Sequence, residues 1–188
     1  MRALWRGGLP AAQRRRWPGR SPTLQLCRRF WVPALLFCLL ASHAKAATSA
    51  EAEADGVVIE ACLDDPQMAG RDPRQCGERV LKSCLSARGD AGQTPAGTLA
   101  CEKRRGEAWI TVERQAYRRI EMRLTDADKR LLRTSQVQFE LELSDLCTAA
   151  RKLAGGDPDL AQAACVSDVV AARALSLLRL AGPHSASP

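Results

Sequence analysis

The sequence predicts an all-α domain, a small disulfide-stapled bundle of about five helices in antiparallel hairpins. Three observations favour this fold class. Apolar residues recur at three- and four-residue steps through most of the chain after residue 56. Helix start and stop residues punctuate those stretches, and no segment shows the two-residue alternation typical of a strand. Six cysteines fall close to the expected helix ends.

Residues 1–46 resemble an export signal. Arg28 and Arg29 precede an apolar run at residues 30–41, and Ala44-Lys45-Ala46 follows as a small-x-small cleavage site. A membrane-spanning helix needs about 20 apolar residues, and the run at residues 30–41 is shorter than that. We therefore expect a cleaved signal and no membrane span after signal cleavage. The arginine pair leaves a twin-arginine signal open. We therefore expect a periplasmic or secreted protein.

The charge balance separates this leader from the rest of the chain. Residues 1–46 hold nine basic and no acidic side chains, whereas the remainder holds 19 basic and 21 acidic ones, a net charge of −2. Because the basic excess lies in the leader, the folded domain is not expected to bind nucleic acid. We expect residues 47–55 to form a flexible tail, residues 56–181 the helical domain and residues 182–188 a second flexible tail.

The first two helices are short. One is expected over residues 57–63, stopped by Asp64-Asp65-Pro66, because the residue before a proline disfavours helix. Asp72-Pro73 then supplies an N-cap acceptor followed by a proline in the first turn. That second helix is expected to end within the segment from Gly89 to Gly92.

The long third helix is expected to start at Thr94-Pro95 or at Thr98 and to reach about Leu124. Its apolar face is predicted from the helical steps that link Trp109, Val112, Ala116 and Ile120.

Two further helices follow. Thr125-x-x-Asp128 resembles a capping box and opens the fourth helix, which Gly155-Gly156 ends. Asp157-Pro158 opens the fifth, which is expected to run to about Leu180. The predicted apolar stripe of the fourth helix is Leu132, Phe139, Leu143, Leu146, Ala150 and Leu153, and that of the fifth is Leu160, Ala164, Cys165, Val169, Ala172 and Leu175.

The cysteines that remain after signal cleavage predict disulfides rather than a metal site. Zinc sites use close cysteine pairs, often with histidine, but His43 and His184 lie in the leader and the tail. Six cysteines allow 15 pairings. Because short loops make consecutive helices antiparallel neighbours, we expect successive cysteines to pair. The predicted disulfides are Cys62–Cys76, Cys84–Cys101 and Cys147–Cys165.

No catalytic constellation can be assembled. The expected core has no histidine, and the chain has no glycine-rich phosphate loop. Paired carboxylates such as Glu140 with Glu142 are expected on solvated helix faces, and Glu107, Glu113 and Glu121 are expected to face water. We predict a protein that is not an enzyme and that uses no metal and no cofactor.

One spacing pattern is specific enough to suggest a family. A Trp lies eight residues after a cysteine and a Tyr eight further, and the next helices carry a Gln, an aromatic residue, two cysteines and an Arg. This pattern resembles the LprI-like lysozyme-inhibitor family, small exported, disulfide-bonded helical proteins of the bacterial envelope. The matching residues are Cys101, Trp109, Tyr117, Gln136, Phe139, Cys147, Gly155-Gly156, Cys165 and Arg173, and Cys76-Gly77 with Cys84 resembles members with an extra N-terminal hairpin.

The chain also departs from that pattern. The family usually has Glu, Asp and Asn where this sequence has Arg105, Ile110 and Arg114, and an Arg-Asp pair where it has Leu143-Ser144. The departures lie at polar positions, and the cysteines and the core signature are kept.

The resemblance implies a protein partner, possibly a lysozyme. Trp109 and Phe139 lie on apolar stripes, so we expect them to pack as core between the third and fourth helices. Since lysozymes are usually basic, acidic residues are plausible partner contacts. The candidates are Glu140, Glu142 and Asp145. The alternative is a non-inhibitory envelope structural or interaction protein on the same scaffold.

Overall fold

The computed structural model describes residues 50–182. These residues belong to the second of the two units into which the chain divides, residues 1–43 and 44–188. The expected leader and the tail from residue 183 onward lie outside the described residues. Residues 50–182 are helical with short connections and contain no strand, which confirms the predicted all-α bundle.

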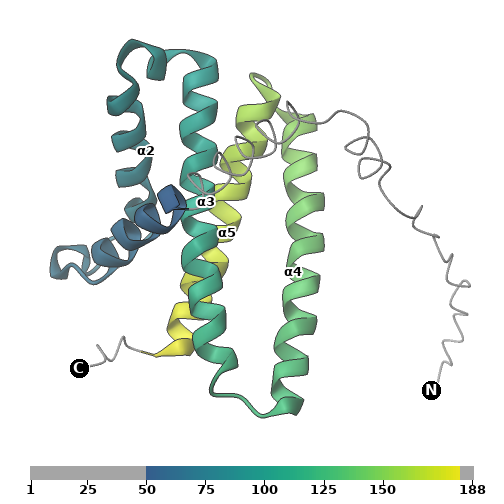
Figure 1. The fold of residues 1–188 in the computed structure, drawn as a ribbon. Coiled ribbons are helices and arrows are strands. Elements are labelled where there is room, and N and C mark those ends of the chain that lie inside the picture. Colours follow the sequence, from purple (N-terminus) through teal and green to yellow (C-terminus); the bar gives the residue numbers. More distant parts are fainter. Residues whose placement is uncertain (1–49, 183–188) are drawn as a thin grey trace, which may run out of the picture. The chain divides into compact units, whose positions relative to one another are not determined.

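The bundle is drawn in Figure 1. A first helix covers residues 50–63 and is followed by a short 3-10 turn, η3 (Pro66–Met68). A second 3-10 segment, η4 (Gly89–Gln93), follows the second helix. The four remaining helices are α2 (Gln75–Arg88), α3 (Pro95–Glu121), α4 (Asp126–Leu153) and α5 (Pro158–Ala181).

Side-chain caps set three of the helix starts. Thr94 accepts a hydrogen bond from the Gly97 amide at 3.1 Å, and Thr125 accepts one from the Asp128 amide at 3.3 Å. Asp157 accepts from the amides two and three residues later at 2.9 and 3.1 Å. Each bond satisfies an amide that has no partner inside its helix. The predicted starts of α4 and α5 are therefore confirmed, and α3 starts at Thr94-Pro95, the first of its two predicted alternatives.

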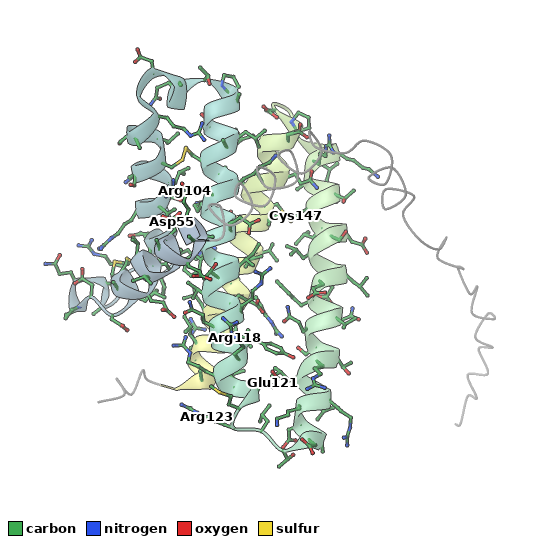
Figure 2. The ribbon with its side chains drawn as sticks, viewed as in Figure 1. Asp55, Arg104, Arg118, Glu121, Arg123 and Cys147 are labelled. Carbon is green, nitrogen blue, oxygen red and sulfur yellow. A yellow bond between two sulfur atoms is a disulfide. The ribbon has the colours of Figure 1, made fainter. Side chains whose placement is uncertain are left out.

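The first helix begins earlier than expected. Residues 50–55 are helical, although the sequence analysis assigned them to a flexible tail. Alanine and glutamate, which dominate this stretch, are strong helix formers. Asp55 also faces α3, where it accepts hydrogen bonds from Arg104 Nε at 2.6 Å and Nη2 at 3.0 Å (Figure 2). This tertiary contact holds the first helix against the bundle.

Helix α5 is the element that connects the bundle. It packs along both α3 and α4, whereas α3 and α4 hardly approach each other directly (Figure 1). Helix α2 packs on α3 alone among the long helices. A wedge between α3 and α4 therefore has α5 at its base.

The main core lies where the first helix, α2, α3 and α5 meet. Trp109 is 1% exposed, and its indole lies against Gly77 of α2. The expectation that Trp109 packs towards the fourth helix is wrong, because its side of α3 faces α2. Phe139 of α4 is half-buried and contacts the edge of this core. The fully buried members include Ile59, Cys62, Cys76, Ala108, Trp109, Val112 and Ala174.

The three disulfides join the predicted pairs. The Cα atoms of Cys62 and Cys76 are 5.6 Å apart, those of Cys84 and Cys101 5.5 Å, and those of Cys147 and Cys165 5.4 Å. Each bond connects two elements that follow each other along the chain, as the helix-end placement required. The first two close the N-terminal hairpins, and the third fastens α4 to α5.

The predicted apolar stripes of α4 and α5 are only partly correct. Leu146 and Leu153 of α4 are 54% and 83% exposed. In α5 the predicted stripe is rotated from the buried one, and Ala172 is exposed. The residues of α5 that are buried are Ala163, Ser167, Val170, Ala171, Ala174, Leu177 and Ala181.

Candidate functional site

The core signature of the resemblance comprises five residues, Trp109, Tyr117, Gln136, Phe139 and Arg173. Four of them, all except Trp109, lie in the wedge between α3, α4 and α5. Tyr117 of α3 and Gln136 of α4 line the same groove. Arg173 of α5 places its guanidinium carbon 5.4 Å from the ring centroid of Phe139, within cation–π range. The same guanidinium donates a hydrogen bond to Ser135 at 2.9 Å. Trp109, the fifth residue, lies in the core instead.

Glu113 lies on the α3 side of this wedge and is 5% exposed. The expectation that it faces water is wrong. It follows Trp109 by four residues and precedes Ala116 by three, so the helical period places it on the buried face of α3. That spacing was the signal that could have identified it from the sequence.

Burial raises the pKa of Glu113 above its ordinary value, because the charged carboxylate is removed from water. The positive charge of Arg173 and the neighbouring Gln136 amide act in the opposite direction, and burial outweighs them. Burying a carboxylate costs desolvation free energy that an apolar side chain in the same space would not cost. Packing alone therefore does not explain a glutamate at this position.

The wedge contains buried hydrogen-bonding atoms that remain unsatisfied. Within residues 50–182, Glu113 Oε1 and Gln136 Oε1 have no hydrogen-bond partner, and neither does Arg173 Nε. Most buried polar atoms in proteins are paired, so three such atoms in one place are unusual. Two are acceptors and one is a donor.

Two of these residues, Glu113 and Gln136, also line an open groove of about 260 Å³ between α3 and α4. Glu113, Arg114, Tyr117 and Arg118 form its α3 wall, and Gln136 and Glu140 form its α4 wall. Figure 2 labels Arg118 on the lower half of α3. The groove thus combines an aromatic ring with groups of both charges, an arrangement suited to binding a polar ligand.

The three acidic candidates of the fourth helix do not form one surface. All three are exposed. Glu140 lines the groove and accepts a hydrogen bond from Gln136 at 3.3 Å. Glu142 lies two residues on, so it points away from Glu140 on the helix, and it accepts from Gln138 at 3.0 Å. The structure therefore brings only Glu140 to the groove, not Glu142 or Asp145.

Two of the residues that depart from the family pattern, Arg105 and Arg114, lie in different parts of the structure. Arg105 is nearly buried and pairs with Glu78 of α2, Glu102 of α3 and Asp168 of α5. Burial raises the pKa of Glu102 despite the opposing charge of Arg105. This cluster joins three helices, and the sequence analysis did not identify it. Arg114, by contrast, is exposed on the groove wall.

Residues 50–182 contain no group of three or more His, Cys, Asp or Glu side chains placed to hold a metal ion. None of the helices in that range is long and apolar enough to cross a membrane. Comparison of the chain with protein-family models, curated proteins and solved structures finds no match.

Proposed function

We propose that this chain is an exported protein-binding module similar to the lysozyme inhibitors, with a lysozyme as its leading partner. One observation carries the proposal. Tyr117 and Gln136, two of the residues on which the resemblance rests, line one groove, and that groove also contains the buried Glu113, which has an unsatisfied carboxylate oxygen. A preformed polar groove of this kind is suited to recognition.

Export to the periplasm or the medium is supported by the cysteines. Three disulfides hold the described bundle, and disulfides persist mainly in oxidising compartments. Residues 28–46 carry the features of a cleavable signal. N-terminal sequencing of the protein recovered from a periplasmic fraction and from the medium tests this, and a product that starts at Met1 contradicts it.

Binding to a basic partner is supported by the charge of the domain. Residues 47–188 carry a net charge of −2, and the exposed Glu140 lies at the groove. Charge complementarity increases the association rate and is screened by salt. Inhibition of a lysozyme should therefore weaken as the salt concentration rises.

The experiment is a titration of the disulfide-intact protein against several types of lysozyme at low and moderate salt, with cell-wall lysis as the readout. Inhibition at micromolar concentration supports the proposal. The reduced protein, whose helices are no longer fastened, is the control and should not inhibit. Absence of inhibition for every type contradicts the lysozyme assignment.

The second candidate is a non-inhibitory envelope interaction protein on the same scaffold. The exposed Arg114 favours it, because a cation stands on the groove wall where the family favours Asn. A substitution on the groove wall alters which partner the groove can bind, whereas the fold, which depends on the buried core, is kept. A pull-down from envelope extract, compared between the wild-type protein and Arg114→Asn, identifies a partner that depends on this residue.

A further inference from the structure

A second groove lies further up the same face of α3 as the groove at Glu113, and no residue lines both. The upper groove, of about 480 Å³, lies between α3 and the start of α5. Its α3 residues are Lys103, Gly106, Glu107 and Ile110, and those of the lower groove are Glu113, Arg114, Tyr117 and Arg118. Steps of three and four residues link the two sets, so both lie on one helix face.

This face is long enough for a chain segment. At 1.5 Å per residue, the distance along α3 from Lys103 to Arg118 is about 22 Å. An extended polypeptide rises about 3.3 Å per residue, so a segment of about seven residues would reach from one groove to the other.

The lining has no net charge. The upper groove has Lys103 and Arg151 against Glu107 and Asp159, and Arg151 and Asp159 pair with each other at 2.9 Å. The lower groove likewise has two arginines and two glutamates. A strongly cationic or anionic ligand therefore gains little from the groove as a whole.

The free hydrogen-bonding atoms favour a ligand that both donates and accepts. Glu113 Oε1 and Gln136 Oε1 require donors, whereas the guanidinium groups of Arg114 and Arg118 on the same groove can only donate. A polypeptide backbone supplies one N–H and one C=O at each residue. The upper groove adds the apolar side chains of Ile110, Ala163 and Val166, which suit an apolar side chain of the same segment.

We propose that the two grooves on this face of α3 bind an extended segment of a partner polypeptide, and that the side chains of Glu113 and Gln136 turn into the lower groove to accept hydrogen bonds from its backbone amides. Backbone hydrogen bonds supply affinity in such sites, and side-chain contacts supply specificity. The inference rests on the proposed function only in taking the partner to be a protein. It does not require that partner to be a lysozyme.

The test is selection of random seven-residue peptides displayed on phage against the immobilised, disulfide-intact protein. Enriched peptides are then synthesised and their affinities measured by calorimetry. Gln136→Leu keeps the side-chain size and removes the acceptor, so it should weaken binding about tenfold. Gln138→Leu is the matched control, because Gln138 is exposed and lies outside both grooves, and it should leave the affinity unchanged.

Amide chemical shifts of the unmodified protein give a second readout that does not depend on a variant. Bound peptide should shift resonances of residues 103–118 and 136–140. Failure to enrich any peptide, or enriched peptides that shift only other residues, overturns the proposal. So does a hexamer of N-acetylglucosamine that shifts these resonances where peptides do not, since the ligand is then a glycan.

The lysozyme titration separates this inference from the proposed function. If peptides bind in the groove but no lysozyme is inhibited, the peptide-binding proposal is supported and the lysozyme assignment is rejected. If the protein inhibits a lysozyme and Gln136→Leu leaves that inhibition unchanged, the proposed function is supported. The groove is then not the surface that binds the lysozyme.

Discussion

The indole of Trp109 lies over Gly77, so close that a β-carbon at Gly77 would be 2.3 Å from the indole nitrogen. Glycine is therefore required on this face of α2 by the close approach of α3. This close approach of the two helices also explains why Trp109, at 1% exposure, is among the most completely buried large side chains of the described residues.

Gly77→Ala should destabilise the protein, because the indole or the backbone of α2 must move to admit the methyl group. Overpacking of this kind costs about 1–3 kcal/mol in the free energy of unfolding. Urea denaturation with the disulfides intact measures it. Gly155→Ala is the control, because a β-carbon there meets nothing within 4 Å. Equal stability of the two variants would show that the indole does not lie over Gly77.

The raised pKa of Glu113 predicts a pH-dependent effect of Glu113→Gln. A carboxyl whose folded pKa lies above its unfolded pKa destabilises the protein once the pH rises through that interval. The glutamine variant lacks this effect. Its melting temperature should therefore exceed that of the wild type at pH 7, and the difference should disappear as the pH falls to about 4, near the unfolded pKa of glutamate.

The comparison between variants isolates this one group. The charges of Arg173, Arg114 and Glu140 all act on Glu113, but these three residues are unchanged in the variant. Glu142→Gln makes the same chemical change at an exposed site and should give a curve parallel to the wild type. A wild type that is more stable than Glu113→Gln at pH 7 would mean that the attraction of Arg173 outweighs burial.

Local chemistry made much of the fold predictable. The caps at Thr94, Thr125 and Asp157 act within three residues, so the sequence alone places them. The disulfides followed from the same boundaries. The first helix was shortened in the prediction because its stability comes partly from Asp55 and Arg104, which are 49 residues apart.

The candidate site was less predictable, because burial depends on which helices meet. Helix α5 packs against both α3 and α4, and apolar residues occur nearly all round it, so its period did not reveal the buried face. Glu113 was assigned to water because of its charge, although its spacing from Trp109 indicated burial. Arg105 was identified only as a departure from the family pattern, and its three carboxylate partners come from three helices.

Arg105→Met should be strongly destabilising at neutral pH. It removes the cation that compensates Glu102, which is 5% exposed. Loss of one partner from a buried ion pair costs about 3–5 kcal/mol. Because burial already raises the pKa of Glu102, lowering the pH should protonate it and recover part of the loss. Chemical denaturation at pH 7 and pH 4 measures both effects.

Arg74→Met is the matched control for this prediction. Arg74 pairs with Asp72 at 2.7 Å, but both side chains are largely exposed. Water compensates the remaining carboxylate there, so the stability should hardly change. If the two methionine variants were equally stable, Arg105 would be a surface residue in solution.

Replacing Cys147 and Cys165 together by serine should release α4 before the rest of the bundle. Cys147 is the only residue of α4 that is fully buried, and the helix packs mainly on α5. Closing a loop of this length stabilises the protein by about 3 kcal/mol in the chain-entropy model. Hydrogen exchange should therefore accelerate in α4 more than in α2 and α3, because regions with few buried contacts open first.

The Cys62–Cys76 disulfide closes a loop of similar length and provides the control. Replacing these two cysteines by serine should instead accelerate exchange in residues 50–63. Uniform acceleration in both variants would show that the bundle unfolds as one unit, with no separate opening of α4.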